Sequence, residues 1–312
     1  MKSLAVIGTL AALLAASHAV GSSKAAFIAH DEFIASVSTA ADWIAPAVSL
    51  TTPAADSYTK STSVTLSGAA GNASGDSTTV TLEVYSGAAA TGTPVLIRAV
   101  TRATTTWTTA VTTLGEGTYT ARATQADSAG NAGTSSARTF TIDTTAPARV
   151  SLAAANGTGT SGRLDAGDAI TFTYSEPMLA SSILSGWTGA SAATVKVRFF
   201  SGAQDAFTVL DSTSAANVKL DAGTINGGGV ALGSGANFVS GTVNFTAALT
   251  QSADDKSFVV TLGSPDNTSR VVSTRTGTAN MTWTPKAGPT DLATNALAST
   301  AAWTETDGDR DF

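Results

Sequence analysis

A junction motif that occurs twice, 101 residues apart, constrains the fold of this chain more than any other feature. The first copy is Ala-Pro-Ala-Val-Ser-Leu at 45–50, and the second is Ala-Pro-Ala-Arg-Val-Ser-Leu at 146–152. Proline marks a linker in such a motif, and the Val-Ser-Leu that follows it indicates a first strand. A repeat of roughly 100 residues is the length of one β-sandwich domain. We therefore expect two tandem domains, at 47–147 and 148–312.

Between the two junctions, apolar residues alternate with Thr, Ser, Arg or Glu, which is the period of half-buried strands. Gly-rich and polar stretches at 68–77, 87–93 and 115–117 supply the turns between them. About seven short strands at even spacing favour a sandwich over helices. The inward positions expected in these strands are Val64, Leu66, Val80, Leu82, Val84, Val95, Ile97, Trp107, Tyr119, Ala121, Ala123, Phe140 and Ile142.

The second segment shows the same short apolar runs and is also expected to be all-β. Its predicted strands are 195–200, 207–210, 243–247, 258–262 and 281–283. A Gly-rich stretch at 223–235 interrupts them and predicts an insertion or a long hairpin within this domain.

Three stretches of the first domain together resemble bacterial immunoglobulin-like (Ig-like) domains: Glu116–Ala121, Asp127–Asn131 and Ile142–Pro147. The resemblance implies that the Tyr119 hydroxyl hydrogen-bonds back to a preceding loop. In the second domain, Asp165–Met178 is similar to the opening of the Ig-like domains of bacterial surface-layer proteins.

Near the end of the chain, Asp291–Leu297 is similar to the closing motif of the same surface-layer family, with Thr294 in place of the usual Gly. The expected fold is therefore all-β, with two tandem immunoglobulin-like β-sandwich domains after an N-terminal signal helix.

The N-terminus has the features of a signal peptide, predicted at 1–25. Lys2 precedes an apolar run at 4–16 that is too short to span a bilayer, which needs about 20 residues. The order Ala26-Phe27, an acidic stretch and then Phe33 resembles exported proteins processed by the SipW signal peptidase, such as TasA-like fibre subunits and camelysin. The mature protein is expected to be secreted, extracellular or at the cell surface, with no membrane span once the signal is removed.

An extended segment and linker is expected at 26–46, after the signal. Phe27, Phe33 and Val37 fall on one side of an extended strand there. In TasA-like fibres the mature N-terminus pairs with a sheet edge of the next subunit, so the resemblance implies self-assembly through this strand. The alternative is that the segment folds back on its own first domain or stays unpaired.

Composition excludes several classes of function. The net charge is −6 and Lys and Arg form no dense cluster, which disfavours nucleic acid as a partner. The chain has no Cys and only two His, at 18 and 30, so it lacks thiol and Ser-His-Asp chemistry and a multi-His zinc site. We therefore predict that the protein is not an enzyme.

A hydrolase that uses only carboxylates is the distant alternative. Glu176 is a candidate catalytic acid, but a Glu beside Pro177 more often satisfies backbone donors at a bend. The pairs Asp165/Asp168 and Asp254/Asp255 lie in polar turns, where Asp is ordinary.

Calcium is the one cofactor that the sequence suggests. Asp127, Asn131 and Asp143 lie where bacterial Ig-like domains collect oxygen ligands near a domain junction, so the resemblance implies a calcium site there. Such a cation needs six to eight oxygen ligands and stiffens the segment that holds it. The acidic tail at 307–311 alternates like the start of a calcium loop, but a solvated tail is the simpler interpretation.

The predicted function is a secreted, non-enzymatic structural or adhesive protein of the bacterial cell surface or extracellular matrix. Its expected partner is a second copy of itself or a cell-surface glycan or protein. The main alternative is a monomeric carbohydrate-binding or adhesion module, for which Trp187 and Trp303 are the candidate surface aromatics. Trp107 and Trp283 lie within strand alternation and are expected in the cores.

Overall fold

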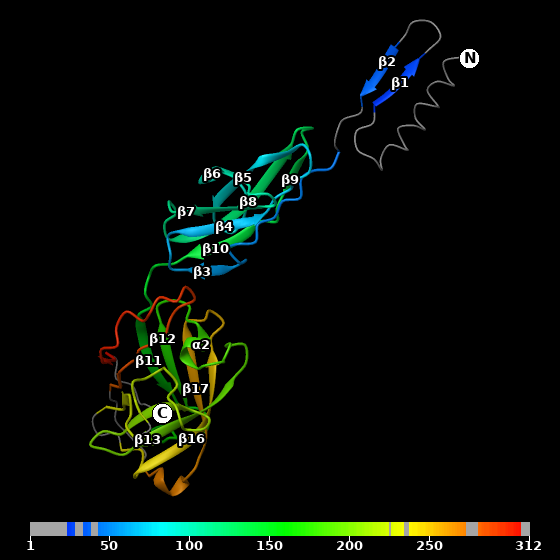
Figure 1. The fold of residues 1–312 in the computed structure, drawn as a ribbon. Coiled ribbons are helices and arrows are strands. Elements are labelled where there is room, and N and C mark those ends of the chain that lie inside the picture. Colours follow the sequence, from blue (N-terminus) through cyan, green and yellow to red (C-terminus); the bar gives the residue numbers. More distant parts are fainter. Residues whose placement is uncertain are drawn as a thin grey trace. The chain divides into compact units, whose positions relative to one another are not determined.

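The computed structural model describes residues 24–28, 34–38, 43–224, 226–233, 237–272 and 280–306. Their contacts divide the chain into two compact units, Met1–Ile142 and Asp143–Phe312. Figure 1 shows that the described parts of both are built from strands. The division precedes the expected boundary at 147, because the chain after Ile142 bonds to the second unit: Asn295 Nδ2 donates to the Asp143 carbonyl and Ala298 N to the Pro147 carbonyl.

Two short strands precede the first sandwich. β1 (Lys24–Ile28) and β2 (Ile34–Ser38) pair antiparallel, with Phe27 opposite Ala35 and Val37 opposite Ala25. The segment therefore forms a hairpin, whereas the sequence suggested a single extended strand. Phe33 and residues 1–23, which carry most of the predicted signal peptide, lie outside the described residues.

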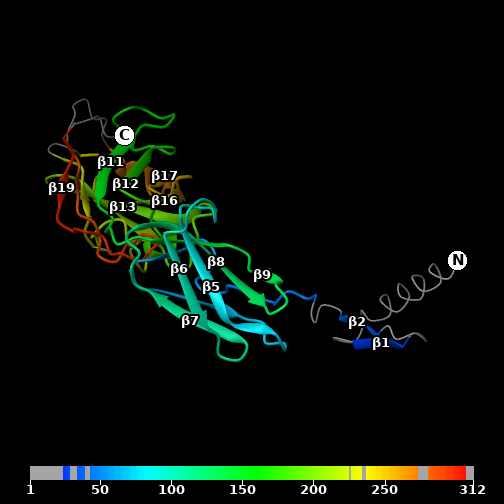
Figure 2. The same ribbon diagram turned by 90° about the horizontal axis from the view of Figure 1, so that it is seen from above.

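The first sandwich consists of a six-stranded sheet and a two-stranded sheet. The small sheet pairs β4 (Val64–Ala69) with β7 (Thr106–Val111), and the chain at 49–52 extends it by hydrogen bonds to β4. Figure 2 shows β5, β6 and β8 of the large sheet side by side. Across that sheet the order is β3 (Ser57–Thr59), β10 (Arg138–Ile142), β8 (Gly117–Asp127), β5 (Asp76–Ser86) and β6 (Leu96–Thr101), and β9 (Ala132–Thr134) pairs with β8.

The core between these sheets follows the alternation in the sequence. Trp107 is buried at its centre, and its indole Nε1 donates to the carbonyls of Ser49 and Ala69 at 3.1 Å. The Tyr119 hydroxyl donates to the Gly115 carbonyl at 3.2 Å, which confirms the bond back to the preceding loop. Other members of this core are Leu66, Val80, Leu82, Val84, Ala121, Ala123, Phe140 and Ile142.

The junction proline of the first unit packs where only glycine fits. A Cβ atom on Gly133 of β9 would overlap the Pro46 carbonyl, and one on Gly71 would approach the Pro46 ring. The segment that carries the repeated Ala-Pro motif therefore packs tightly against the sandwich at these two glycines.

One strand has the opposite phase to that expected. Val95 and Ile97 were predicted to point inward, but 54% and 63% of their surface is exposed. β6 begins at Leu96, so its alternation turns Leu96 and Val100 toward the core and Ile97 outward. A shift of one residue exchanges the two faces of a strand, and an apolar run such as Val-Leu-Ile does not fix the phase by itself.

In the second unit, the described strands form one nine-stranded sheet that folds over itself. Trp283 of the eighth strand packs against Phe172 and Tyr174 of the second, with ring centroids 5.2 and 5.6 Å apart, so distant strands face each other across the core. All five expected strands are present. The order is β11 (Arg149–Ala155), β12 (Ala169–Tyr174), β17 (Ser257–Pro265), β16 (Thr242–Gln251), β13 (Ala193–Phe200), β14 (Ala206–Asp211), β15 (Val230–Ala231), β18 (Thr282–Trp283) and β19 (Trp303–Thr304).

A helical turn, α2 (Ala180–Ile183), and a 3-10 turn, η2 (Thr268–Arg270), lie in connections of the second unit. Just after α2, Trp187 is 8% exposed and its indole Nε1 donates to the Ser191 carbonyl at 2.7 Å. Its expected surface role is therefore wrong, because Trp187 packs into the core beside Phe258. Trp303 on β19 is half-buried and packs against the same core.

The Gly-rich stretch of the second unit is organised by a buried carboxylate. Asp221 is fully buried and accepts hydrogen bonds from Thr208 Oγ1 (2.6 Å), Val209 N (2.9 Å) and Gly223 N (2.8 Å). A Cβ atom on Gly229 would overlap this carboxylate, so glycine is required at that point of closest approach. Asp221 thereby ties β14 to the stretch that follows it.

Two further buried carboxylates hold connections in the same way. Asp168 accepts from the main-chain N–H groups of Gly157 and Asp165, and Asp205 accepts from those of Gly202 and Val239. Burial raises the pKa of both Asp168 and Asp205. Neither lies in the carboxylate cluster of the second unit described below, so the structure gives Asp168 a role in holding a turn.

Candidate metal centre

Three carboxylates converge in the second unit. Asp143, Glu176 and Asp291 each offer an oxygen, and these oxygens all lie within 4.8 Å of one another. Asp291 is buried, while Asp143 and Glu176 are half-buried. Among the described residues this is the one group of three or more Asp, Glu, His or Cys side chains so placed. We call it the acidic cluster.

The bend after β12 brings Glu176 to the cluster. The strand ends at Tyr174, and Ser175 is fixed to the first residues of the unit, since its N–H donates to the Ala148 carbonyl and its Oγ accepts from Ala148 N. Met178 then forms a β-bridge with Asp291. The bend therefore joins the start of the unit to its closing loop.

Asp291 is held by its own loop. Asn295 donates through its main-chain N–H to Asp291 Oδ1 and through Nδ2 to Oδ2, each at 2.8 Å. The same Nδ2 donates to the Asp143 carbonyl at 2.8 Å. The Asp143 carboxylate is also fixed locally, because its Oδ1 accepts from Thr145 N. Asn295 thus links the two Asp residues of the cluster.

The first unit contains a loop of the same construction. Asp127 accepts from the main-chain N–H of Ala129 and from the N–H and Nδ2 of Asn131, at 2.7–2.9 Å. The Asn131 side chain holds the pKa of Asp127 below its usual value, aided by the loop N–H groups and opposed by burial. The backbones of the two loops also match, because the residue three after the Asp has a positive φ in each. Gly130 has φ 91° in the first unit, and Thr294 has φ 69° in the second.

The donor set of the acidic cluster suits a hard divalent cation. Carboxylate oxygens are the ligands that Ca²⁺ prefers, and each can accept a hydrogen bond while keeping a lone pair for a metal. Three carboxylates so close together repel one another, and a cation would offset that repulsion. Asp143, Glu176 and Asp291 are the residues that would hold it.

The cluster contains one of the three residues that the sequence suggested. Asp143 belongs to it, whereas Asp127 and Asn131 lie in the other compact unit. Glu176, weighed above as a catalytic acid or a bend residue, and Asp291, noted above only for its closing motif, complete it. The repeated Asp-x-Ala-x-Asn pattern at 127 and 291 was the available signal.

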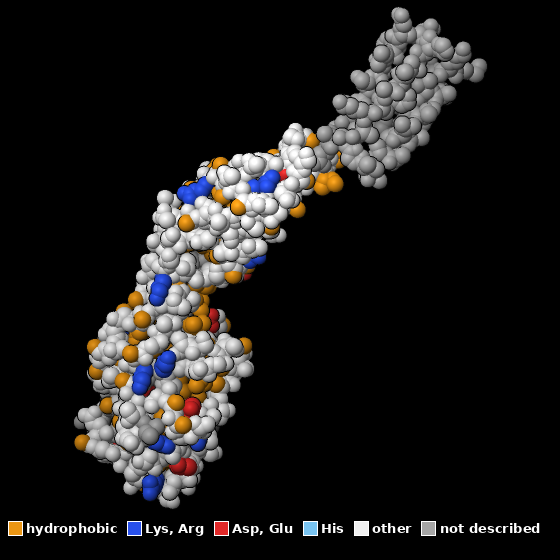
Figure 3. Space-filling model, viewed as in Figure 1, with side chains coloured by type: hydrophobic (Ala, Val, Ile, Leu, Met, Phe, Trp, Pro, Cys, Tyr) orange, Lys and Arg blue, Asp and Glu red, His pale blue; other side chains and the backbone are white. Residues whose placement is uncertain are grey.

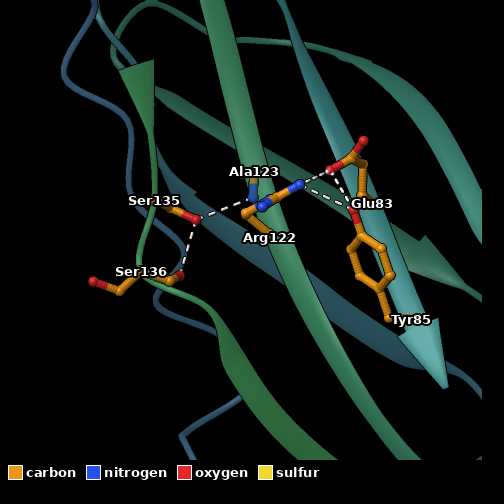
Figure 4. A network of polar contacts seen from close by, with 6 residues as sticks. All are labelled: Glu83, Tyr85, Arg122, Ala123, Ser135 and Ser136. Carbon is orange, nitrogen blue, oxygen red and sulfur yellow. Dashed lines mark hydrogen bonds and ion pairs between the residues drawn. The ribbon is translucent and has the colours of Figure 1, made fainter. Parts of the chain in front are cut away.

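A second polar network lies on the outer face of the large sheet in the first unit (Figure 4). Arg122 Nη2 donates to Glu83 Oε2 (2.7 Å) and to the Tyr85 hydroxyl (3.0 Å), and that hydroxyl donates to Glu83 Oε2 (2.8 Å). The Arg122 hydrogen bond holds the pKa of Glu83 below its usual value. The three side chains bond to one another across β5 and β8, which is the geometry of a cross-strand tie.

The Ig-like character of the first unit is supported by a family comparison. Residues 46–144 match the bacterial Ig-like domain family. That match covers the first sandwich from its junction proline to the residue after Asp143. A search of curated proteins gives no match.

Two solved structures are similar over much of the chain. One contains the fibronectin(III)-like modules of CbhA from Clostridium thermocellum, with 13% identity over 70% of this chain and 90% of that one. The other is dimeric latent PorU from Porphyromonas gingivalis, with 14% identity over 71% of this chain and 20% of that one. Both have a TM-score of 0.25, so the all-β assignment rests on the strand topology of this chain. No helix among the described residues is long and apolar enough to cross a membrane.

Proposed function

We propose that this chain is a secreted, non-enzymatic structural or adhesive protein of the bacterial cell surface or extracellular matrix. The observation that carries the proposal is the bacterial Ig-like match over 46–144, because such domains fit a surface or adhesion module. The second β-sandwich unit is consistent with that role. Fold alone does not determine function, and assembly of the purified protein distinguishes a matrix component from a monomeric binding module.

The proposed route to a matrix is self-association through the N-terminal segment. Its two short strands pair only with each other among the described residues, and a sheet edge of another subunit could replace that pairing. We expect purified mature protein to form filaments, and a variant that starts at Ala45 to remain unpolymerised. Light scattering and negative-stain microscopy measure both. Two indistinguishable monomers would instead favour the alternative, a monomeric carbohydrate-binding or adhesion module.

The carbohydrate-binding alternative loses one of its supports in the structure. Trp187 is buried and Trp303 packs against the core, so neither forms an open aromatic platform. Trp43 is 76% exposed at the start of the first unit, but a single aromatic side chain gives little area for stacking on a sugar.

We also propose that the acidic cluster binds calcium. The earlier expectation placed Asp143 with Asp127 and Asn131, and the proximity of Asp143, Glu176 and Asp291 now supports a site within the second unit. Calcium bound only by the folded state would stabilise that unit by mass action, by about 2.7 kcal/mol when its concentration is 100 times Kd. Calorimetry of the full chain, with calcium and with a chelator, measures this effect.

Two matched variants locate the site. Glu176→Gln is expected to abolish the calcium-dependent shift of the second unit's transition, because it removes one carboxylate of the acidic cluster. Asp127→Asn changes the corresponding loop of the first unit and should leave that shift intact. A shift confined to the first unit and lost in Asp127→Asn would restore the original expectation. Identical melts with and without calcium would remove the metal altogether.

A further inference from the structure

The chain contains two Asn-Gly pairs, at 156–157 and 226–227, and both lie in the second unit. Asparagine is a chemically labile residue, and a following glycine makes it more so, because no side chain hinders attack by the glycine nitrogen on the asparagine side chain. Asn156 and Asn226 are both exposed, while Gly157 is exposed and Gly227 is half-buried. Exposure alone would therefore make Asn156 the more reactive of the two.

The main chain at Gly157 is held firmly. Its N–H donates to Asp168 Oδ1 at 2.9 Å, and Asp168 is fully buried. The other oxygen of this carboxylate accepts from Asp165 N at 2.7 Å, which fixes the acceptor in turn. A Cβ atom on Gly157 would lie 2.5 Å from the Gly167 carbonyl, so the two backbones are in close contact. The Gly157 nitrogen cannot approach the Asn156 side chain without breaking a bond to a carboxylate.

Gly227 is held less firmly. Its N–H donates to the Thr224 carbonyl at 3.1 Å, and Thr224 N donates to the Gly227 carbonyl at 2.7 Å. Both of these bonds join neutral groups, and both lie within one short turn. The nearest atom to a Cβ built on Gly227 is Thr224 Oγ1 at 3.7 Å, which is an ordinary contact. The Gly227 nitrogen can therefore reach the Asn226 side chain through movement of this turn alone.

We propose that Asn226 is a site of spontaneous deamidation and that the fold protects Asn156 from the same reaction. The Gly227 nitrogen bonds to Cγ of Asn226, the bond from Cγ to Nδ2 breaks, and the Gly227 amide proton leaves with Nδ2 as ammonia. Water then opens the five-membered imide. Its addition at Cγ gives aspartate at position 226, and its addition at the main-chain carbonyl carbon gives isoaspartate, in which the chain runs through Cγ.

The reaction changes charge more than it changes the fold. Each product carries a carboxylate, so a conversion adds one negative charge to a unit whose charged side chains are scattered on the face that Figure 3 shows. Isoaspartate also lengthens the main chain of the turn. Both ends of the turn are tied to the core, because Gly223 N donates to Asp221 Oδ1 and Gly229 N to the Phe207 carbonyl. We therefore expect the second unit to stay folded after conversion.

The test is storage of the purified mature protein at neutral pH, below its melting transition, followed by peptide mapping with mass spectrometry. Trypsin separates the two sites, since it cuts after Arg163 and Lys219. Asn226 is expected to convert about tenfold faster than Asn156, because a bond to a charged group is harder to break than one to a neutral group. In concentrated urea, where neither turn is folded, the two rates should be alike.

Gly227→Ala tests the attacking nitrogen. The space beside Gly227 admits a methyl group and its φ lies outside the left-handed region, so the variant should fold, which its thermal melt checks. Conversion at 226 should slow several-fold, with Asn156 as the unchanged internal control. The proposal is overturned by equal rates at the two sites in the folded protein, by a difference that persists in urea, or by a folded Gly227→Ala variant that converts as fast as the wild type. None of these results bears on the proposed assembly or calcium site.

Discussion

Asp221→Ala is expected to lower the free energy of unfolding of the second unit by about 2–6 kcal/mol. The substitution leaves the N–H groups of Val209 and Gly223 without their acceptor, and each buried, unsatisfied donor costs about 1–3 kcal/mol. Thr208 also loses a bond from its hydroxyl, although that group can rotate. Calorimetry of the full chain should show a large downward shift of the second unit's transition and no change in the first.

Asp254→Ala is the matched control. Its carboxylate also accepts two bonds, from Ser252 Oγ and Lys256 N, but the side chain is exposed in a turn where water can replace it. We expect a loss below about 1 kcal/mol there. Equal losses for the two variants would show that burial of the Asp221 carboxylate does not set its contribution.

The sequence predicted the strands and the large core residues because both follow from short-range patterns. Alternation gave the inward faces of β4, β5 and β8, and it placed Trp107 and Trp283 in the cores where the structure has them. The phase of β6 failed for a physical reason. Three consecutive apolar residues, Val95 to Ile97, satisfy either face, and only the pairing with β5 selects one.

The buried carboxylates could not be predicted from their positions in the sequence. Asp168 lies in a Gly- and Asp-rich turn, where exposure is the ordinary expectation. Its burial follows from main-chain donors at Gly157 and Asp165 that point inward and need an acceptor. The burial of Asp221 was equally unpredictable, because its donors lie on β14 and in the Gly-rich stretch rather than in its own turn.

The acidic cluster was missed for a different reason. Asp143, Glu176 and Asp291 are far apart in the sequence, and only the complete sheet order brings the end of β12 beside the closing loop. The loop itself was recognisable, because Asp291 and Asn295 repeat the spacing of Asp127 and Asn131. The local repeat was a signal that could have pointed to Asp291, whereas the remaining ligands of the site required the fold.

Stability of the second unit is expected to fall by about 3 kcal/mol in total through Asp221 as the pH rises from about 2.5, below the pKa of this carboxyl in the unfolded chain, to about 7.5, above its pKa in the folded chain. Burial raises the pKa of this carboxyl from 3.8 to about 6, against the opposing effects of its hydrogen-bond donors and of Lys286. Between these values the unfolded chain has lost the proton and the folded chain retains it, which favours the unfolded state. Each pKa unit corresponds to about 1.36 kcal/mol. Below this range, and above it, the contribution is constant.

The measurement compares the wild type with Asp221→Asn, whose side chain does not titrate, by urea unfolding at about pH 4 and about pH 7. The difference between the two proteins isolates this group, because the other carboxyls are common to both. That matters since the pKa values of Asp211 and Asp254 are lowered, and such groups lose their stabilising contribution as the pH falls. We expect the advantage of the wild type over the variant to be about 2.4 kcal/mol larger at the lower pH, because part of the effect is already lost at pH 4, where the unfolded carboxyl is partly ionised. An advantage that is equal at both values would contradict the raised pKa and leave Asp221 ionised throughout the range.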